Sequence, residues 1–224
     1  MDSRPARTSA ARPAYAYTRG HPRFPSHLSP PSHPIMAKLS SKTVALLISP
    51  KGTEEPEFAQ PKKALEDAGA TVVVVSTESG EAKTVNNDLE PGGTYKIDKT
   101  IGEVSASDFN SLVIPGGTVG ADTLRADEDV VAFVRAFFEQ KKPVAAICHA
   151  PWVLIEAGLV QGRTVTSYRS IRTDLKNAGA EVVDREVARD TDGPFPLVTS
   201  RNPNDLPAFT EAIVEVFADA GQPA

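Results

Sequence analysis

One stretch of this chain, residues 143–151 (PVAAICHAP), places a cysteine and a histidine side by side. Cys148 is the only cysteine among the 224 residues, and His149 is the only histidine after residue 33. The thiolate is the nucleophilic form of cysteine, and an adjacent histidine is suited to take up the thiol proton. The pair therefore predicts a reactive thiol, with His149 as the group that moves its proton.

The residues around the thiol fit a sharp turn from a strand into a helix. A nucleophile on such a turn needs small residues two positions to either side, and Ala146 and Ala150 occupy those positions. Pro151 suits the first helical turn, where its missing N–H has no partner in any case. The free N–H groups and the dipole of a helix start favour the thiolate. The alternatives are that Cys148 is a small buried apolar side chain and that His149 only hydrogen-bonds the helix start.

Attack of a thiolate on a carbonyl group creates an oxyanion, which N–H donors about 3 Å away stabilise. The PGG stretch at residues 115–117 supplies two candidates for substrate binding, Gly116 and Gly117. Glycine lets the backbone approach a ligand closely, and a helix start leaves N–H groups free. We therefore expect the N–H groups of Gly117 and His149 to hold the oxyanion.

Short apolar runs alternate along the chain with amphipathic segments. Strands buried on both faces are predicted at residues 43–49, 71–77, 110–117 and 143–148, and further strands at 181–187 and 195–201. Helices are predicted at residues 127–142, 149–159, 170–180 and 204–220. Residues 53–70 predict a helix that is kinked at Pro61 or becomes regular only from there. Residues 80–98 predict a small antiparallel excursion, and residues 105–109 a capped single turn.

Buried strands that alternate with amphipathic helices indicate right-handed βαβ units around a mostly parallel sheet. The predicted fold is an α/β three-layer sandwich, in one domain that spans residues 39–224. Such sheets bind ligands beyond the carboxyl ends of their strands. The PGG stretch, the Cys148–His149 pair and the turn at residues 51–55 (KGTEE) all fall at such ends. We therefore expect them to face one crevice.

Residues 1–38 differ from the rest of the chain in composition. The first 35 residues contain seven prolines, five arginines and three histidines, but one acidic residue. Frequent prolines block helix and sheet, and too little apolar surface is present to offset chain entropy, so we predict disorder over residues 1–38. Two explanations stay open. Either Met36 is the true start and the extension is mis-assigned, which we favour, or the segment is an organelle transit peptide.

Charge and hydropathy exclude several classes of partner. From residue 36 onwards the chain carries 19 basic and 28 acidic residues, a net charge of −9. An acidic domain cannot neutralise phosphates, so no nucleic-acid partner is expected. No apolar run approaches the roughly 18 residues of a membrane span, so no membrane partner is expected either. A single cysteine cannot form an internal disulfide, which favours a reducing, cytoplasmic location.

The residue types also argue against cofactors. Cys148 and His149 are adjacent, so their side chains point in different directions, and the domain has no further cysteine or histidine to complete a zinc site. Residues 115–122 (PGGTVGAD) contain glycines but neither a GxGxxG nor a GK[ST] pattern. We therefore expect no metal, nucleotide or flavin. Glutaminase-type cysteine hydrolases on related folds take their base from a later histidine, and the absence of one here excludes that class.

Five stretches occur in order along the domain: GTEEPE, LVIPGG, AAICHAP, VTSYRSIRTDLKNAGAEVVD and VTSRNPNDLPAF. Together they resemble the PfpI family, within the superfamily of the parkinsonism-associated protein deglycase. The resemblance covers roughly residues 42–217 and none of the N-terminal extension. It implies a flavodoxin-like fold, shared with class I glutamine amidotransferases, and a homodimer or higher homo-oligomer.

The resemblance also implies roles for individual residues. Cys148 is expected to be the catalytic nucleophile, in a strained backbone conformation, and His149 the acid or base. Glu57 is expected to hydrogen-bond the sulfur as a protonated carboxyl, whereas we expect Glu54 and Glu55 to be solvated charges at a helix start. Some members complete a triad with an acid from a neighbouring subunit, just after PGG. Asp122 is the nearest candidate, one residue later than in the family pattern.

The expected function is a stress-protective, cysteine-dependent hydrolase or glyoxalase. Its substrates would be small reactive carbonyl compounds such as methylglyoxal, or the adducts that these leave on proteins. Two other functions stay open. One is an intracellular cysteine peptidase, which needs a strongly activated base. The other is a non-catalytic redox sensor or chaperone, which needs only an accessible thiol of low pKa.

Overall fold

The computed structural model of this chain describes residues 38–220, and its centre is a seven-stranded sheet with strand order β11-β12-β8-β7-β1-β3-β6. The strands are β1 (Thr43–Leu47), β3 (Thr71–Ser76), β6 (Lys99–Thr100), β7 (Ser111–Ile114), β8 (Val144–Ile147), β11 (Val187–Asp190) and β12 (Leu197–Ser200). Neighbouring strands are parallel except for β11 and β12. The predicted mostly parallel sheet is confirmed. Disorder was predicted for residues 1–38. All of these residues except Lys38 lie outside the described range, so the prediction is not tested.

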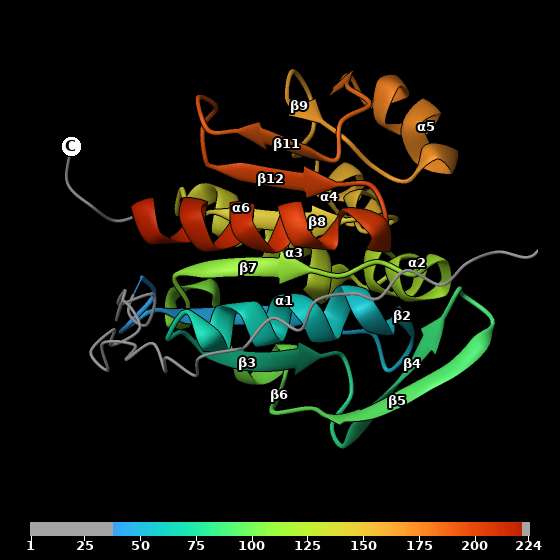
Figure 1. Ribbon diagram of the computed structural model, residues 1–224, viewed down its shortest axis with the longest axis vertical. Coiled ribbons are helices and arrows are strands. Elements are labelled where there is room, and N and C mark those ends of the chain that lie inside the picture. The colour runs from blue at the N-terminus through green and yellow to red at the C-terminus, as the bar shows by residue number, and fades with distance from the viewer. Residues whose placement is uncertain (1–37, 221–224) are drawn as a thin grey trace, which may run out of the picture. The chain divides into compact units, whose positions relative to one another are not determined.

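Helices cover both faces of the sheet (Figure 1). One face carries α1 (Glu55–Asp67) and α6 (Leu206–Asp219). The other face carries α2 (Thr118–Arg125), α3 (Glu128–Glu139), α4 (Pro151–Glu156) and α5 (Arg172–Asn177). Short 3-10 helices lie at η1 (Ile101–Glu103), η2 (Ala106–Asp108), η3 (Arg169–Ile171) and η4 (Pro203–Asp205). The layers confirm the predicted α/β sandwich.

The apolar runs of the inner strands explain the two cores. Alternate side chains of a strand point to opposite faces, and β1 (TVALL) is flanked by β3 and β7. Ala45 and Leu47 therefore pack in the core beneath α3 and α4, whereas Val44 and Leu46 pack in the core beneath α1 and α6. Each fully buried side chain of valine or leucine size contributes about 1.5–3 kcal/mol to the stability of the fold. The two cores therefore stabilise the sandwich in which β7 and β8 pair.

Two small sheets extend from this sandwich. The first joins β2 (Lys51–Glu54), β4 (Glu81–Asn86) and β5 (Glu90–Lys96), with β4 and β5 antiparallel as predicted for residues 80–98. The second joins β9 (Thr164–Val165) to β10 (Glu181–Val182). The loop between β4 and β5 is important for the site, because it brings residues 87 and 88 towards the carboxyl end of β7.

Four local expectations are corrected. Residues 51–54 are strand β2 rather than a turn, and α2 was not predicted at all. Residues 181–187 split between β10 and the start of β11. Helix α1 is continuous from residue 55, so it does not become regular only at Pro61. Pro61 costs α1 a hydrogen bond, but Phe58 and Leu65 on the same helix are fully buried and offset that loss.

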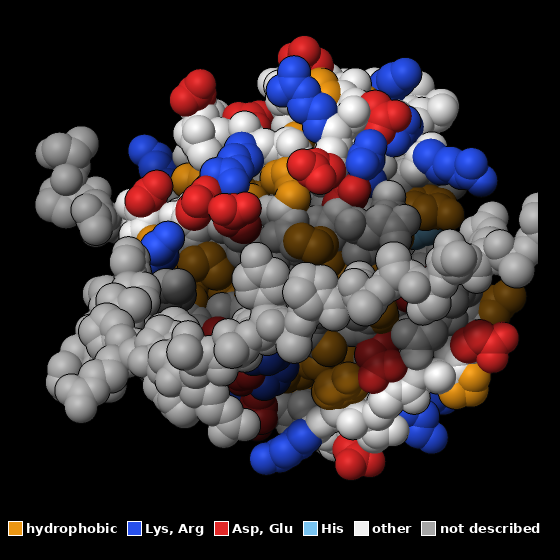
Figure 2. All heavy atoms as spheres, viewed as in Figure 1, with side chains coloured by type: hydrophobic (Ala, Val, Ile, Leu, Met, Phe, Trp, Pro, Cys, Tyr) orange, Lys and Arg blue, Asp and Glu red, His pale blue; other side chains and the backbone are white. Residues whose placement is uncertain are grey.

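The surface of the described part is charged but mixed. Figure 2 shows basic and acidic side chains interspersed on one face. Surface ion pairs of the described part include that of Arg189 with Glu215 and that of Arg201 with Asp184. No continuous basic patch is visible among the coloured residues of that face. In the range 38–220, none of the helices combines the length and the apolar character that crossing a membrane requires.

Candidate active site

The carboxyl ends of β7 and β8 lie next to each other, and each is followed by predicted site residues. Gly116 and Gly117 follow β7, whereas Cys148 and His149 follow β8 and lead into α4. Cys148 has a φ of 64°, in the left-handed region that costs a non-glycine residue of order 1 kcal/mol or more. The backbone therefore turns sharply after β8, with the strained conformation at Cys148 that the family resemblance implied.

Long-range backbone hydrogen bonds hold this turn in place. The N–H of Cys148 donates to the carbonyl of Ser200 at 3.1 Å, and its carbonyl accepts from the N–H of Tyr168 at 2.9 Å. The thiol is nearly buried, with 6% of the residue exposed. Both neighbours, Ala146 and Ala150, are completely buried. Their complete burial agrees with the small-residue pattern.

The imidazole of His149 faces the thiol. Its Nδ1 lies 3.2 Å from Cys148 Sγ, and its Nε2 lies 3.0 Å from Ser170 Oγ and 3.4 Å from Thr118 Oγ1. The ring packs against Tyr168, with 4.8 Å between ring centroids. Burial lowers the pKa of His149, and the charge of Asp88 acts in the opposite direction. The neutral ring is therefore favoured, and it is correctly placed to accept the thiol proton.

Glu57 approaches the sulfur from helix α1. It is fully buried, its Oε2 accepts from the N–H of Gly116 at 3.0 Å, and its carboxyl interacts with the Cys148 side chain. Burial raises the pKa of Glu57 to about 8. Its Oε1 is buried without a partner in hydrogen-bonding geometry, which also disfavours the charged form. Glu57 therefore holds its proton at neutral pH and is able to donate it towards the sulfur.

The balance of forces on the thiol differs from the sequence-based expectation. Burial and the proximity of a charged Glu57 raise the pKa of Cys148, whereas the N–H groups of Gly117 and His149 lower it. The contribution of the Glu57 charge is absent while Glu57 keeps its proton. Helix α4 starts only at Pro151 and has six residues, so its dipole is a weak source of activation. The donors that favour the thiolate are therefore the N–H groups of Gly117 and His149.

The two glycines after β7 are required by close contacts. A Cβ on Gly116 would lie 2.7 Å from Cys148 Cβ, from Glu57 Oε2 and from the carbonyl oxygen of Ile147. Gly117 has a φ of 89°, and a Cβ there would lie 2.3 Å from the carbonyl oxygen of Gly52. Glycine is therefore needed to bring the β7 end, α1 and the thiol together.

We expect Gly116→Ala to destabilise the protein by about 1–3 kcal/mol, because one of the three contacts is with a backbone oxygen that cannot move aside. Urea unfolding measures the change. Gly102→Ala is the matched control, since a Cβ there meets no atom within 4 Å. Equal unfolding midpoints for the two variants would contradict the close packing around Gly116.

The expectation that Glu54 and Glu55 are solvated charges is wrong. Glu54 is 6% exposed, and its carboxylate accepts from the N–H groups of Asn87 and Asp88 at 2.8 and 3.1 Å. Glu55 is half-buried and accepts from the hydroxyl of Tyr95 at 2.7 Å, which lowers its pKa. Both acids tie α1 and β2 to the β4–β5 hairpin, Glu54 at its loop and Glu55 at Tyr95 of β5, a connection that residue spacing does not reveal.

Asp122 lies apart from the thiol within this chain. It is exposed on α2 and pairs with Arg125, whose guanidinium lies 4.6 Å from the ring of Trp152. Its contribution through a neighbouring subunit stays a prediction. Arg201, which the sequence places near a strand end, is half-buried and pairs with the exposed Asp184 and the buried Asp205.

Three residues that hydrogen-bond around His149 were not predicted: Asp88, Thr118 and Ser170. Asp88 Oδ1 accepts from the N–H of Thr118 at 2.7 Å, and Asp88 Oδ2 accepts from its hydroxyl at 3.0 Å. Thr118 and Ser170 both approach His149 Nε2. Thr118 follows PGG directly, so its position after a strand end was a usable signal. Asp88 lies in a hairpin turn, and nothing local distinguishes it from an ordinary turn residue.

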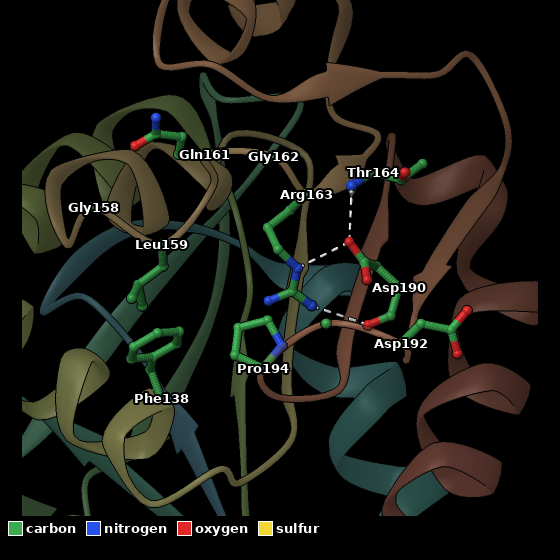
Figure 3. Close-up of a pocket in the computed structure, with 11 residues that line it drawn as sticks. Phe138, Gly158, Leu159, Gln161, Gly162, Arg163, Thr164, Asp190, Asp192 and Pro194 are labelled. Carbon is green, nitrogen blue, oxygen red and sulfur yellow. Dashed lines mark hydrogen bonds and ion pairs between the residues drawn. The ribbon is translucent and has the colours of Figure 1, made fainter.

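The pocket over the thiol is small, at about 180 Å³. Its lining residues are Glu54, Glu57, Asn87, Asp88, Gly117, Cys148, His149, Tyr168 and Pro203. A larger pocket of about 610 Å³ surrounds Arg163 (Figure 3). Arg163 Nε pairs with Asp190 there at 2.9 Å, and Nη2 donates to the carbonyls of Asp190 and Phe195. That pocket contains neither the thiol nor a histidine, so the smaller pocket is the candidate active site.

Within residues 38–220, no group of three histidine, cysteine, aspartate or glutamate side chains is arranged to hold a metal ion. That no metal, nucleotide or flavin is needed stays a prediction.

Comparison with known proteins finds a family model and several relatives that match most of this chain. The model of the DJ-1/PfpI family matches residues 42–216. Putative cysteine protease YraA of Bacillus subtilis is 47% identical over 169 residues, which cover 75% of this chain and 94% of that protein. Protein/nucleic acid deglycase 2 of Escherichia coli is 43% identical over 177 residues, which cover 79% of this chain and 98% of that protein.

Among solved structures, a two-domain protein from Anabaena variabilis with DJ-1/ThiJ/PfpI-like and ferritin-like domains is 38% identical, with a TM-score of 0.72. The match covers 82% of this chain and 50% of that one, so the present chain spans about half the length of that protein. The fold and the strained cysteine turn define a class of flavodoxin-like α/β proteins. Within that class, this chain belongs to the DJ-1/PfpI family, as its sequence motifs predicted.

Proposed function

We propose that this chain is a cysteine-dependent hydrolase or glyoxalase that acts on small reactive carbonyl compounds and on glycated proteins. The observation that carries the proposal is the position of Cys148 Sγ. It lies 3.2 Å from His149 Nδ1, against the Glu57 carboxyl and within reach of the N–H groups of Gly117 and His149. A nucleophile, a base and oxyanion donors therefore surround one point.

With methylglyoxal, the sulfur attacks the aldehyde carbon and the thiol proton passes to His149 Nδ1. The N–H groups of Gly117 and His149 stabilise the oxygen of the resulting hemithioacetal. His149 or Glu57 then moves a proton from the former aldehyde carbon to the adjacent carbon, which oxidises the first and reduces the second. Water hydrolyses the thioester that is formed, releases lactate and returns the thiol.

The names of relatives support enzymatic activity of hydrolase type. One relative is called a deglycase and another a putative cysteine protease. The pocket size favours the small carbonyl over a peptide as substrate. About 180 Å³ is small beside the roughly 300–1,000 Å³ of pockets that bind drug-sized ligands, and the thiol is nearly buried.

A peptidase and a redox sensor are the competing functions. A peptidase needs an extended cleft around the thiol, and the small pocket argues against one. A sensor needs an accessible thiolate. Cys148 is nearly buried, so an oxidant reaches its sulfur poorly, which argues against the sensor at neutral pH. A cytoplasmic, reducing location suits both a sensor and an enzyme, because the one thiol must stay reduced. A stress-protective role and a homo-oligomeric state belong to the same proposal.

The name of the Escherichia coli relative includes nucleic acids. The acidic domain and the mixed surface charges argue against tight electrostatic binding of nucleic acid here. A glycated base offers the same carbonyl chemistry as a glycated protein, however, and does not require a basic groove. Glycated nucleotides are therefore included among the substrates to be tested.

We expect the purified protein to convert methylglyoxal to lactate and to release intact side chains from methylglyoxal-treated peptides and nucleotides. Lactate is followed enzymatically, and peptide products by mass spectrometry. Cleavage of an unmodified peptide, without turnover of methylglyoxal, would support the peptidase instead. Absence of both activities, with rapid oxidation of Cys148 by peroxide, would support the sensor.

A further inference from the structure

We infer that Asp88, acting through the hydroxyl of Thr118, fixes the proton of the His149 imidazole on Nε2 and so leaves Nδ1 free to accept the proton of Cys148. The inference rests on the proposed function of this site and adds two positioning residues to it. An acid that orients the histidine then comes from this same chain.

The direction of the hydrogen bonds follows from the number of hydrogens available. A carboxylate only accepts, and Asp88 accepts twice from Thr118: at Oδ1 from its N–H, at 2.7 Å, and at Oδ2 from its hydroxyl, at 3.0 Å. A hydroxyl has one hydrogen, so the Thr118 hydroxyl has none left for His149. Its Oγ1, 3.4 Å from His149 Nε2, must therefore accept. The contact is long, as catalytic hydrogen bonds often are without substrate.

The tautomer of the ring follows from this. A neutral imidazole carries one proton, and an acceptor next to Nε2 keeps the proton on that nitrogen. Nδ1 is then an acceptor, 3.2 Å from Cys148 Sγ. When the S–C bond forms, the thiol proton passes to Nδ1, and the carboxylate of Asp88 faces the imidazolium through Thr118. This is the logic of a nucleophile, a base and an orienting acid, with a threonine between the last two.

The other groups around the ring are compatible with this arrangement. Ser170 Oγ lies 3.0 Å from Nε2 and is able to accept the same proton, because a hydroxyl both donates and accepts. The titratable and charged groups that line the pocket are Glu54, Glu57, Asp88, Cys148 and Tyr168. The Arg125 guanidinium lies over the ring of Trp152, which in turn packs against the imidazole of His149. Among them, the charge of Asp88 favours the imidazolium.

The fold holds Asp88 in position independently of His149. Asn87 and Asp88 both have positive φ angles, 51° and 63°, which places them in a tight turn at the tip of the β4–β5 hairpin. The carboxylate of Glu54 accepts from both of their N–H groups. Glu54 precedes α1 directly, so one buried acid ties the hairpin tip to the helix that carries Glu57.

The test replaces Asp88 by asparagine, which keeps the shape. The Thr118 N–H still needs an acceptor, so the amide oxygen faces it and the amide NH₂ faces Thr118 Oγ1. The hydroxyl then turns its hydrogen to His149 Nε2 and favours the wrong tautomer. Thr118→Val removes the hydroxyl at nearly constant shape, whereas Thr118→Ser retains it. Asp192→Asn, at an exposed acid outside this pocket, is the charge control.

Two rates are measured on the full-length protein. The first is the alkylation of Cys148 by iodoacetamide as a function of pH, which is specific because the chain has no other cysteine. The second is kcat/KM for methylglyoxal. We expect Asp88→Asn and Thr118→Val to lower both at pH 7 by about 10–100-fold. We expect Thr118→Ser and Asp192→Asn to stay within about twofold of the wild type.

The pH profile separates positioning from damage to the fold. If Asp88 acts through the base, the alkylation profile of Asp88→Asn moves to higher pH, and its plateau at high pH equals that of the wild type. An unshifted profile, or a plateau that is lowered as well, overturns the inference. A loss of turnover in Asp122→Asn with full activity in Asp88→Asn also overturns it and supports an acid from a neighbouring subunit.

Alkylation needs no substrate, so it tests the inference even where methylglyoxal is not turned over. If the wild-type protein does not turn over methylglyoxal but the variants show the predicted alkylation profiles, the proposed function is contradicted and the inference about Asp88 stands.

Discussion

Replacement of Cys148 by serine is expected to abolish turnover of methylglyoxal, with kcat/KM lowered by about 10³-fold or more. An alcohol is far less acidic than a thiol, and a protonated Glu57 cannot accept the serine proton, so His149 alone activates serine much less than it activates cysteine. The substitution changes one atom and leaves the backbone turn intact. Steady-state kinetics with lactate detection measures the effect.

The control for this prediction is the stability of the variant. Serine fits the space of Cys148, so the thermal midpoint of Cys148→Ser is expected within a few degrees of the wild type. The variant contains no cysteine and must not react with iodoacetamide, which gives a check on its identity. Turnover that remains within tenfold of the wild type would remove Cys148 from the mechanism and, with it, the proposed function.

The second large effect concerns the dependence of stability on pH. Burial raises the pKa of Glu57 from an ordinary value of 4.5 to about 8. Between these pH values the unfolded chain releases the proton and the folded protein keeps it, so the free energy of unfolding falls as pH rises. Below about pH 4.5 both states are protonated and no contribution remains. Across the whole window the loss is about 4–5 kcal/mol as an order of magnitude.

Glu57→Gln removes this dependence because its amide is neutral at every pH and has nearly the same shape. We expect the variant to match the wild type near pH 4.5 and to become increasingly more stable than the wild type up to pH 8. Urea unfolding at pH 5, 6.5 and 8 measures the difference. Glu211→Gln, at an exposed position on α6, is the matched control for the loss of one carboxylate. Parallel stability curves for wild type and Glu57→Gln would mean that Glu57 is ionised at neutral pH.

Much of the fold was predictable from local patterns. The apolar runs within residues 43–49, 71–77, 110–117 and 143–148 each form an inner strand of the sheet, because a strand covered on both faces requires apolar side chains at successive positions. Strand β2 and helix α2 were missed for the opposite reason. Their sequences, KGTE and TVGADTLR, contain glycine and polar residues. They are held in place by packing against each other, since a Cβ on Gly52 would lie 2.8 Å from Val119 Cβ.

The candidate site, like the fold, has one part that local sequence predicts and another that only the tertiary structure shows. The sequence by itself determined the adjacent Cys148 and His149, with small residues around them, because a turn from strand to helix is a local event whose steric demands appear in neighbouring positions. Only the tertiary structure decided the surroundings of that pair. Glu54 and Glu57 are both acids at the start of α1, and one anchors a hairpin whereas the other keeps a proton beside the sulfur.

Asp88 is about 60 residues from Cys148 in the chain and reaches His149 only through Thr118. The charge state and the hydrogen-bond direction of a buried polar group depend on every group that surrounds it in space. Partners that are remote in the chain leave no trace in the local pattern of residues. The sequence therefore predicted the candidate nucleophile, whereas only the folded protein shows the hydrogen-bond partners from which we infer the path of its proton.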